Sequence, residues 1–320
     1  MRVRVPPPAP LNALRNCHFP VNGGGGTGDI PIPGLAEALE KANTDRSKPF
    51  FYAQHRPIYG TLPEAKPEIL EKSANYGALK AHPNVLAFFG HCHRNCADEL
   101  NLWQGAFTAV HVPSTNYCGS RGGRENSFSA GNKPDKKRVQ QMQRTHVDHT
   151  NQLLFMSVYG EKIVIARRDI WNDAPMGPDW TIPLPSPDGT CTETARRSIS
   201  LAPEFPEGAV ATVAVGRGKD RAQKEREEVV VSFPAAHAVS GRPRAYDYEI
   251  VASASGFNPL VRRVFSTRPC WTDAADTEPV RCVFGRFELP KSGKVAFAIK
   301  PRNAFGVSGE PLSTTMSLSR

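Results

Sequence analysis

An apolar run from Val85 to Phe89 that stops at Gly90-His91-Cys92-His93 is the feature that most constrains this fold. A short apolar run bounded by a glycine predicts a buried strand. Gly90 allows a sharp turn of the backbone, so that His91 and His93 follow at the strand end. The preceding strand-like run ends in the same way, at His55. Two strands therefore carry three histidines at their carboxyl ends.

The segment between these strands predicts a helix, which makes the two strands parallel. It runs from Leu62 to Lys80, with Pro63 near its first turn, acidic residues early and Lys80 late. Strand, helix and strand with so long a connection form a parallel crossover, so both histidine-bearing ends lie at one sheet edge. Imidazole nitrogens bind Zn, Fe and Mn. The sequence predicts a metal site there.

Further elements extend this α/β pattern. A helical apolar face at 34–42 precedes the strand at 49–54, and strands are predicted at 106–112 and 153–165, the second a hairpin turning at 160–162. They flank an irregular basic segment, 113–150. The first part of the chain is therefore expected to be an α/β domain.

The remainder of the chain is predicted to form a linker followed by an all-β domain. Residues 175–199 begin with a proline-rich stretch and predict the linker. Short strand patterns then predict an antiparallel β-sandwich, with the charged run 217–228 as an exposed loop. The predicted strands are 209–215, 229–233, 246–252, 283–289, 294–300 and 312–318, and the aromatic core residues are Phe233, Tyr248, Phe287 and Phe297.

Composition excludes several classes of protein. The net charge of +9 over 320 residues is dispersed, and the densest basic stretch, 133–144, lacks the interleaved aromatics that stack on bases, so no nucleic-acid partner is expected. No apolar run approaches the roughly 18 to 20 residues of a membrane span. The basic, proline-rich start at 1–10 lacks the apolar core of a secretory signal. Cys270 and Cys282 could form a disulfide or remain two thiols.

The histidine blocks resemble a known family. Gln54-His55-Arg56-Pro57 after one strand and Gly90-His91-Cys92-His93 after the next are similar to the last two metal-binding blocks of the calcineurin-like metallophosphoesterases, and His55-Arg56-Pro57-Ile58-Tyr59 resembles their purple-acid-phosphatase branch. The likeness spans 29–171. It implies that His55 and His91 bind one metal ion and His93 the second, that the ions are Fe, Zn or Mn, and that the enzyme hydrolyses phosphate mono- or diesters.

The earlier blocks of that family are not found. Asp29 is followed by Ile-Pro-Ile rather than by a second acidic ligand, and Asn16 stands where an Asp should precede His18. The chain therefore looks like the C-terminal part of such a domain, and we expect a truncated form with little or no phosphatase activity. The upstream DNA is expected to encode the missing blocks.

The C-terminal pattern resembles a fibronectin type III module, because Asn303-Ala-Phe-Gly-Val-Ser stands between its last two predicted strands. The predicted organisation is thus an irregular segment at 1–28, a partial phosphoesterase domain at 29–174, the linker at 175–199 and a fibronectin-like sandwich at 200–320. Such a module favours a secreted or periplasmic location.

Other interpretations remain open. A structural zinc site could use His91 and His93 with Cys92 and Cys96. The His146-Val147-Asp148-His149 cluster is expected at the surface, His82 at a helix end, and His111 has no partner that the sequence identifies. The alternative function is a non-catalytic binding or adhesion protein, in which a degenerate phosphoesterase half supports the β-sandwich.

Overall fold

The computed structural model describes residues 31–62, 67–116, 118, 123–126, 151–220, 223–236, 243–266 and 279–319. The chain divides into two compact units. The first comprises 1–115, 151–170 and 178–199, and the second comprises 116–150, 171–177 and 200–320. The segment predicted to be irregular, 1–28, lies outside the described residues.

A mixed sheet forms the centre of the first unit. Its strand order is β1 (Phe50–Gln54), β2 (Val85–Phe89), β4 (Thr108–His111) and β3 (Leu102–Gln104). β1, β2 and β4 run parallel, and β3 is antiparallel to β4. Strands β1 and β2 are almost wholly buried, as expected for parallel strands covered on both faces. The predicted parallel crossover from β1 to β2 is confirmed.

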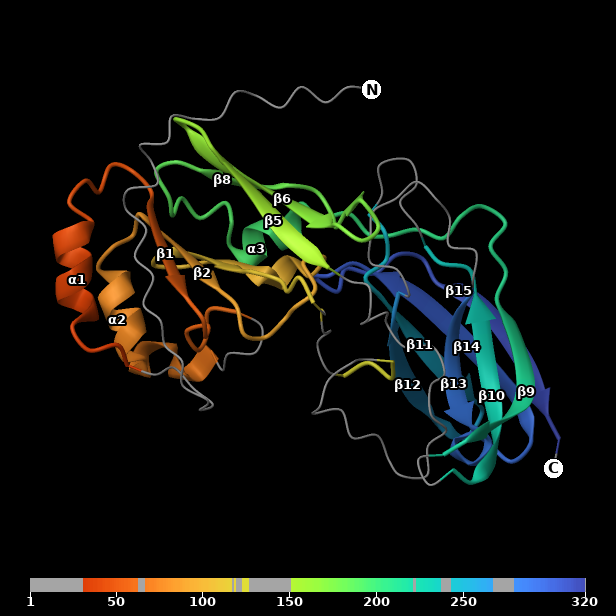
Figure 1. Cartoon of the computed structure of the whole chain (residues 1–320). Coiled ribbons are helices and arrows are strands. Elements are labelled where there is room, and N and C mark those ends of the chain that lie inside the picture. Colours follow the sequence, from red (N-terminus) through yellow and green to blue (C-terminus); the bar gives the residue numbers. More distant parts are fainter. Residues whose placement is uncertain are drawn as a thin grey trace. The chain divides into compact units, whose positions relative to one another are not determined.

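Helices cover one face of this sheet and a second sheet covers the other, as Figure 1 shows. Helix α1 (Leu35–Ala42) contributes Leu35 and Leu39, and α2 (Ala74–Lys80) contributes Leu79, to a core with the alternate residues of β1 and β2. The antiparallel sheet on the opposite face contains β5 (Gln152–Val158), β6 (Lys162–Asp169) and β8 (Trp180–Pro183). This unit is α/β, as the sequence predicts.

The prediction of a single helix at 62–80 is wrong. The chain instead forms a 3₁₀ helix, η2 (Pro67–Lys72), followed by α2. Ser73 separates them in an extended conformation, and its hydroxyl accepts a hydrogen bond from the backbone N–H of Tyr76 at 3.0 Å. This side-chain N-cap starts a new helix at Ala74 rather than continuing the first one.

The range predicted as a linker, 175–199, contains ordered elements of the first unit from Pro178 onward. These are β8 and helix α3 (Glu193–Ser198), whereas the two-residue strand β7 (Ala174–Pro175) precedes them. Glu99, in the 3₁₀ helix η3 (Glu99–Asn101), fastens this segment. Its carboxylate accepts hydrogen bonds from Arg167 at 2.6 Å, Trp180 at 2.8 Å and Arg196 at 2.8 Å. Paired, buried charges of this kind stabilise the segment only as a complete set.

The second unit contains two antiparallel sheets. One has the order β13 (Val280–Gly285), β10 (Glu225–Phe233) and β9 (Thr212–Lys219). The other has the order β12 (Phe257–Phe265), β11 (Asp247–Ala254), β14 (Gly293–Arg302) and β15 (Leu312–Leu318). A short 3₁₀ helix, η4 (Arg286–Glu288), follows β13.

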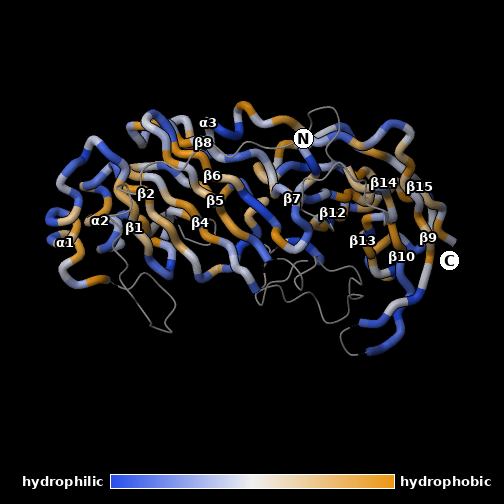
Figure 2. The backbone as a smooth tube through the Cα atoms, turned by 45° about the horizontal axis from the view of Figure 1, so that its top comes forward, coloured by the Kyte–Doolittle hydropathy of each residue, from blue (hydrophilic) through white to orange (hydrophobic). Residues whose placement is uncertain are grey.

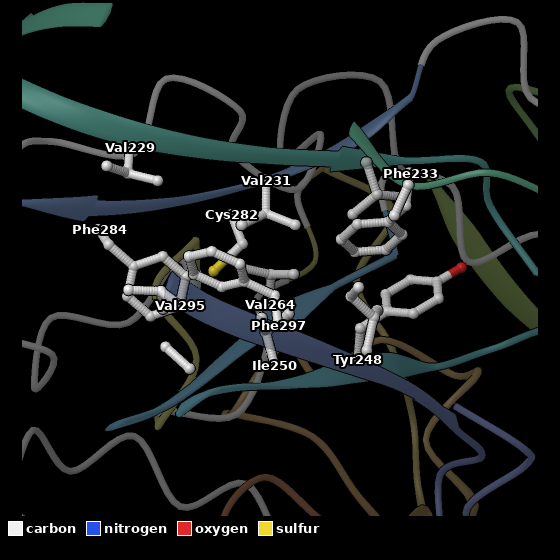
Figure 3. Packing of buried hydrophobic residues seen from close by; sticks show 14 of the residues in the cluster. Val229, Val231, Phe233, Tyr248, Ile250, Val264, Cys282, Phe284, Val295 and Phe297 are labelled. Carbon is white, nitrogen blue, oxygen red and sulfur yellow. The ribbon is translucent and has the colours of Figure 1, made fainter. Parts of the chain in front are cut away.

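Alternate residues of both sheets meet in one core, shown in Figure 3. Val229, Val231 and Phe233 of β10 face Tyr248 and Ile250 of β11 across it. The Tyr248 hydroxyl accepts a hydrogen bond of 2.8 Å from the backbone N–H of Ala236, which satisfies a buried donor. The Cys282 side chain also lies in this core as a free thiol, and Cys270 falls outside the described residues.

Two expectations for this unit need correction, and one strand was not predicted. Phe287 is 56% exposed, because it lies in η4 beyond the end of β13 rather than in a strand. The charged run 217–228 is not a loop, because β9 and β10 pair as far as Lys219 and Glu225. In Figure 2 these two strands become hydrophilic toward that charged run. Strand β12 was not predicted, since its apolar residues do not alternate with polar ones.

Candidate metal-binding site

The parallel strands β1 and β2 bring His55 and His91 to one edge of the sheet. Gln54 and Phe89 are the last paired residues of the two strands, so both chains leave the sheet at the same level. The backbone N–H of Gly90 then donates to the His55 carbonyl at 3.0 Å. A Cβ atom at residue 90 would lie 3.6 Å from that carbonyl oxygen, which is an ordinary van der Waals contact, so the approach of the two strands does not itself require glycine.

A tight turn folds His91 back toward His55. His91 has a φ of 68°, and the N–H of Cys92 donates to the Gly90 carbonyl at 2.8 Å. A hydrogen bond between residues two apart around a left-handed residue defines a γ-turn, a rare and strained conformation. His93 has a φ of 49° as well. Each such residue costs about 1 to 3 kcal/mol, and strain of this kind concentrates at functional sites.

The two imidazoles are close enough to share a ligand. His55 Nε2 lies 3.3 Å from His91 Nδ1, the ring centroids are 5.2 Å apart, and both residues are exposed. This distance permits a weak hydrogen bond. It also fits a metal ion, because imidazole nitrogens lie about 2.1 Å from bound zinc and two of them at a tetrahedral angle are about 3.4 Å apart.

The surroundings of the partly exposed His91 lower its pKa and so favour the neutral imidazole. Burial is the largest cause that lowers its pKa, and the positive charge of Arg56 and the neighbouring His55 and His93 lower it further. A neutral imidazole has the free lone pair that a metal ion needs. Arg56 also lies near Cys92, whose pKa burial raises to about 11 and Arg56 lowers. The Arg56 Nε is buried with no hydrogen-bond partner in the described part of the chain.

The structure brings His55 and His91 together, but it does not assemble a larger ligand set. Within the described ranges, no group of three or more His, Cys, Asp or Glu side chains is arranged to hold a metal ion. His93 and Cys92 are half-buried, and Cys96 is fully buried. The assignment of His93 to a second metal ion therefore stays a prediction, and so does the alternative zinc site.

His111 is a neighbour of this site that the sequence did not identify. It ends β4, the third parallel strand, and is paired with Phe89 of β2. Burial lowers its pKa to about 3, the charge of Arg94 and the neighbouring His93 and His91 lower it further, and a hydrogen bond to the Gly90 backbone opposes the shift. The sequence did contain one signal for His111, which is its position at the end of a predicted strand. If that strand lies parallel beside β2, its end lies at the same edge of the sheet as His91.

The other histidines lie elsewhere. His82 follows α2, as predicted, and is buried. Its Nδ1 lies 3.1 Å from the Asn43 amide nitrogen, which also donates to Asn84 at 2.9 Å. This polar cluster precedes the amino end of β2, far along that strand from His91. His146 and His149 lie outside the described residues.

Comparison with protein-family models and with curated proteins finds no match for this chain. None of the helices in the described ranges is long and apolar enough to span a membrane.

Proposed function

We propose that the first unit is a divalent-metal-binding phosphoesterase unit of the calcineurin-like type, and that this chain alone hydrolyses phosphate esters slowly or not at all. The observation that carries the proposal is the His55–His91 pair. Two parallel strands and a strained γ-turn at His91 hold its nitrogens 3.3 Å apart. Ligands of open α/β sheets gather at this carboxyl edge.

The side chains at this site are suited to hold one metal ion rather than two. The imidazole pair supplies two ligand nitrogens in suitable geometry, and no carboxylate joins them among the side chains that the structure describes. A two-metal centre needs bridging and terminal ligands in addition. We therefore expect weak binding of a single Mn, Fe or Zn ion. When bound, such an ion would polarise a phosphoryl oxygen of the substrate.

Arg56 supports phosphate esters as the substrate class. Its guanidinium lies near enough to His91 to lower the pKa of that imidazole. Guanidinium groups match phosphate oxygens in both charge and geometry. An arginine beside a metal-binding pair is suited to hold the phosphoryl group while the ion contacts another of its oxygens.

The strand order of the second unit supports its interpretation as a fibronectin type III-like module. Its sheets have the orders β13-β10-β9 and β12-β11-β14-β15, a division into three and four strands in which β9–β10, β11–β12 and β14–β15 are hairpin pairs and β13 pairs with β10. Modules of this kind position or bind other molecules. This arrangement also favours the second candidate function, a non-catalytic binding protein in which the first unit is a platform.

Hydrolysis of p-nitrophenyl phosphate and bis(p-nitrophenyl) phosphate with added Mn²⁺ or Zn²⁺ tests the proposal. We expect turnover at or near the rate without protein, while the metal still binds. Rapid turnover that His91→Ala abolishes would refute the expectation of low activity and support an enzyme. Absence of both turnover and metal binding would leave the binding-protein candidate and overturn the phosphoesterase proposal.

A further inference from the structure

A groove lies on the outer face of the three-stranded sheet of the second unit, opposite the face that packs on the core. It has a volume of about 740 Å³ and is lined by residues of β9, β10 and β13. Its polar lining residues are Thr212, Arg217, Glu228, Ser232 and Arg281. A single sugar ring or a short chain of them fits a space of this size.

Two glycines open the sheet face around Glu228. In the register of the sheet, Glu228 of β10 lies between Gly216 of β9 and Gly285 of β13. The Glu228 side chain lies over Gly216, where a Cβ atom would be 3.4 Å from its Oε1, and the Phe287 ring lies over Gly285. Val230 is the next residue of β10 on this face. It packs against Val283 and forms the apolar floor of the groove.

Glu228 is a buried carboxyl group with unused hydrogen-bonding capacity. It is only 7% exposed, and its Oε2 has no hydrogen-bond partner in the part of the chain that is described. Burial raises its pKa, and the charge of Arg281 partly opposes the shift. An unsatisfied buried polar group costs stability, so its presence on a sheet face requires a reason. A ligand that donates hydrogen bonds to this carboxyl group would supply one.

The borders of the groove add positive charge and an aromatic surface. Arg281 pairs with Ser232, so its side chain lies on the groove face, whereas Arg217 pairs with Glu227 and its side chain leaves the opposite face. The Phe287 ring covers Gly285, since a Cβ atom there would lie 2.5 Å from the ring, and Phe287 is 56% exposed. Apolar C–H faces of a ligand can pack on such a ring.

These features together select the chemistry of the occupant. We propose that this groove binds an acidic saccharide, whose hydroxyl groups donate to Glu228 and whose carboxylate or sulfate group contacts Arg281. The positive charge of Arg281 disfavours a metal cation. An extended peptide cannot pair with β10, because β10 already pairs on both sides within the sheet. The proposal does not depend on the metal site of the first unit.

Calorimetric titration of the full chain with three tetrasaccharides tests this inference. Tetragalacturonate carries carboxylates, a heparin-derived tetrasaccharide carries sulfates, and cellotetraose is neutral. We expect at least one acidic probe to bind at least tenfold more tightly than cellotetraose, and the two acidic probes distinguish carboxylate from sulfate. Arg281→Ala and Glu228→Gln should each weaken that binding at least tenfold, since each removes a charged hydrogen-bonding group.

Controls separate binding from folding and from general charge attraction. Glu228→Gln replaces a buried acid with a neutral side chain of the same shape, so the variant should be at least as stable as the wild type to urea. Lys294→Ala removes an exposed positive charge of β14 and should leave the affinity unchanged. The proposal is overturned if neither acidic probe binds, or if Glu228→Gln, Arg281→Ala and Lys294→Ala all weaken binding equally.

Discussion

His111 gives the chain a stability that depends on pH in a calculable way. The side chain is 1% exposed and neutral in the folded protein, where burial lowers its pKa from 6.5 to about 3. In the unfolded chain the imidazole returns to its ordinary pKa and takes up a proton below pH 6.5. Between these two pKa values the unfolded state binds more protons, so the free energy of unfolding falls as the pH falls.

The size of this effect follows from the two pKa values. At pH 7.5 the contribution is close to zero, and at pH 5 it amounts to a loss of about 2 kcal/mol, because roughly 97% of unfolded chains are then protonated at this site. His111→Gln keeps a polar side chain of similar size but cannot titrate. It should therefore lose less stability than the wild type between pH 7.5 and pH 5, by about 2 kcal/mol.

Urea unfolding followed by tryptophan fluorescence at both pH values measures this difference. Thr108→Val is a matched control in the same strand, because it removes a buried hydroxyl that lies 2.8 Å from the Ser186 hydroxyl and adds no titratable group. Its loss of stability relative to the wild type should be the same at both pH values. If His111→Gln and the wild type lose stability equally on acidification, the buried neutral histidine is not the cause and the reasoning fails.

Three further predictions concern buried residues within each of the two units. Glu99→Gln should lower the free energy of unfolding by about 3 to 5 kcal/mol, because it leaves the buried Arg167 without its anionic partner. Urea titration measures this loss, and a value below about 1 kcal/mol would contradict the prediction. Tyr248→Phe should cost about 1 to 3 kcal/mol, since the Ala236 N–H loses its acceptor, and an unchanged urea midpoint would disprove that. Burial strongly raises the pKa of Cys282, so its thiol should resist iodoacetamide until the chain unfolds, and labelling at the rate of an exposed thiol would show the core to be open.

The sequence predicted those elements whose signals are local. The apolar runs at Val85–Phe89 and before His55 became β2 and β1, and the long connection between them made these strands parallel. The same logic placed His55 and His91 at one edge. Their pairing at 3.3 Å depends on a turn that the sequence predicted at Gly90, whereas the residue with a left-handed backbone is His91.

Elements that depend on tertiary contacts were not predictable in this way. The proline-rich range after Pro178 looks like a linker, but Glu99 and its cationic partners order it against the first unit. Ser73 divides a helical pattern that looked continuous, through a single hydrogen bond. Phe287 has an aromatic side chain in a strand-like pattern, yet the chain leaves the sheet at Gly285 just before it. His111 was missed because only the strand order brings it beside the site.

Metal binding at the His55–His91 pair is the central claim, and titration with Co²⁺ monitored by visible absorption tests it most directly. The account predicts that one Co²⁺ binds to the wild type, that His55→Ala and His91→Ala each weaken the affinity at least tenfold, and that His82→Gln, at the opposite end of β2, leaves it unchanged. Equal Co²⁺ affinity in all four proteins would contradict the account.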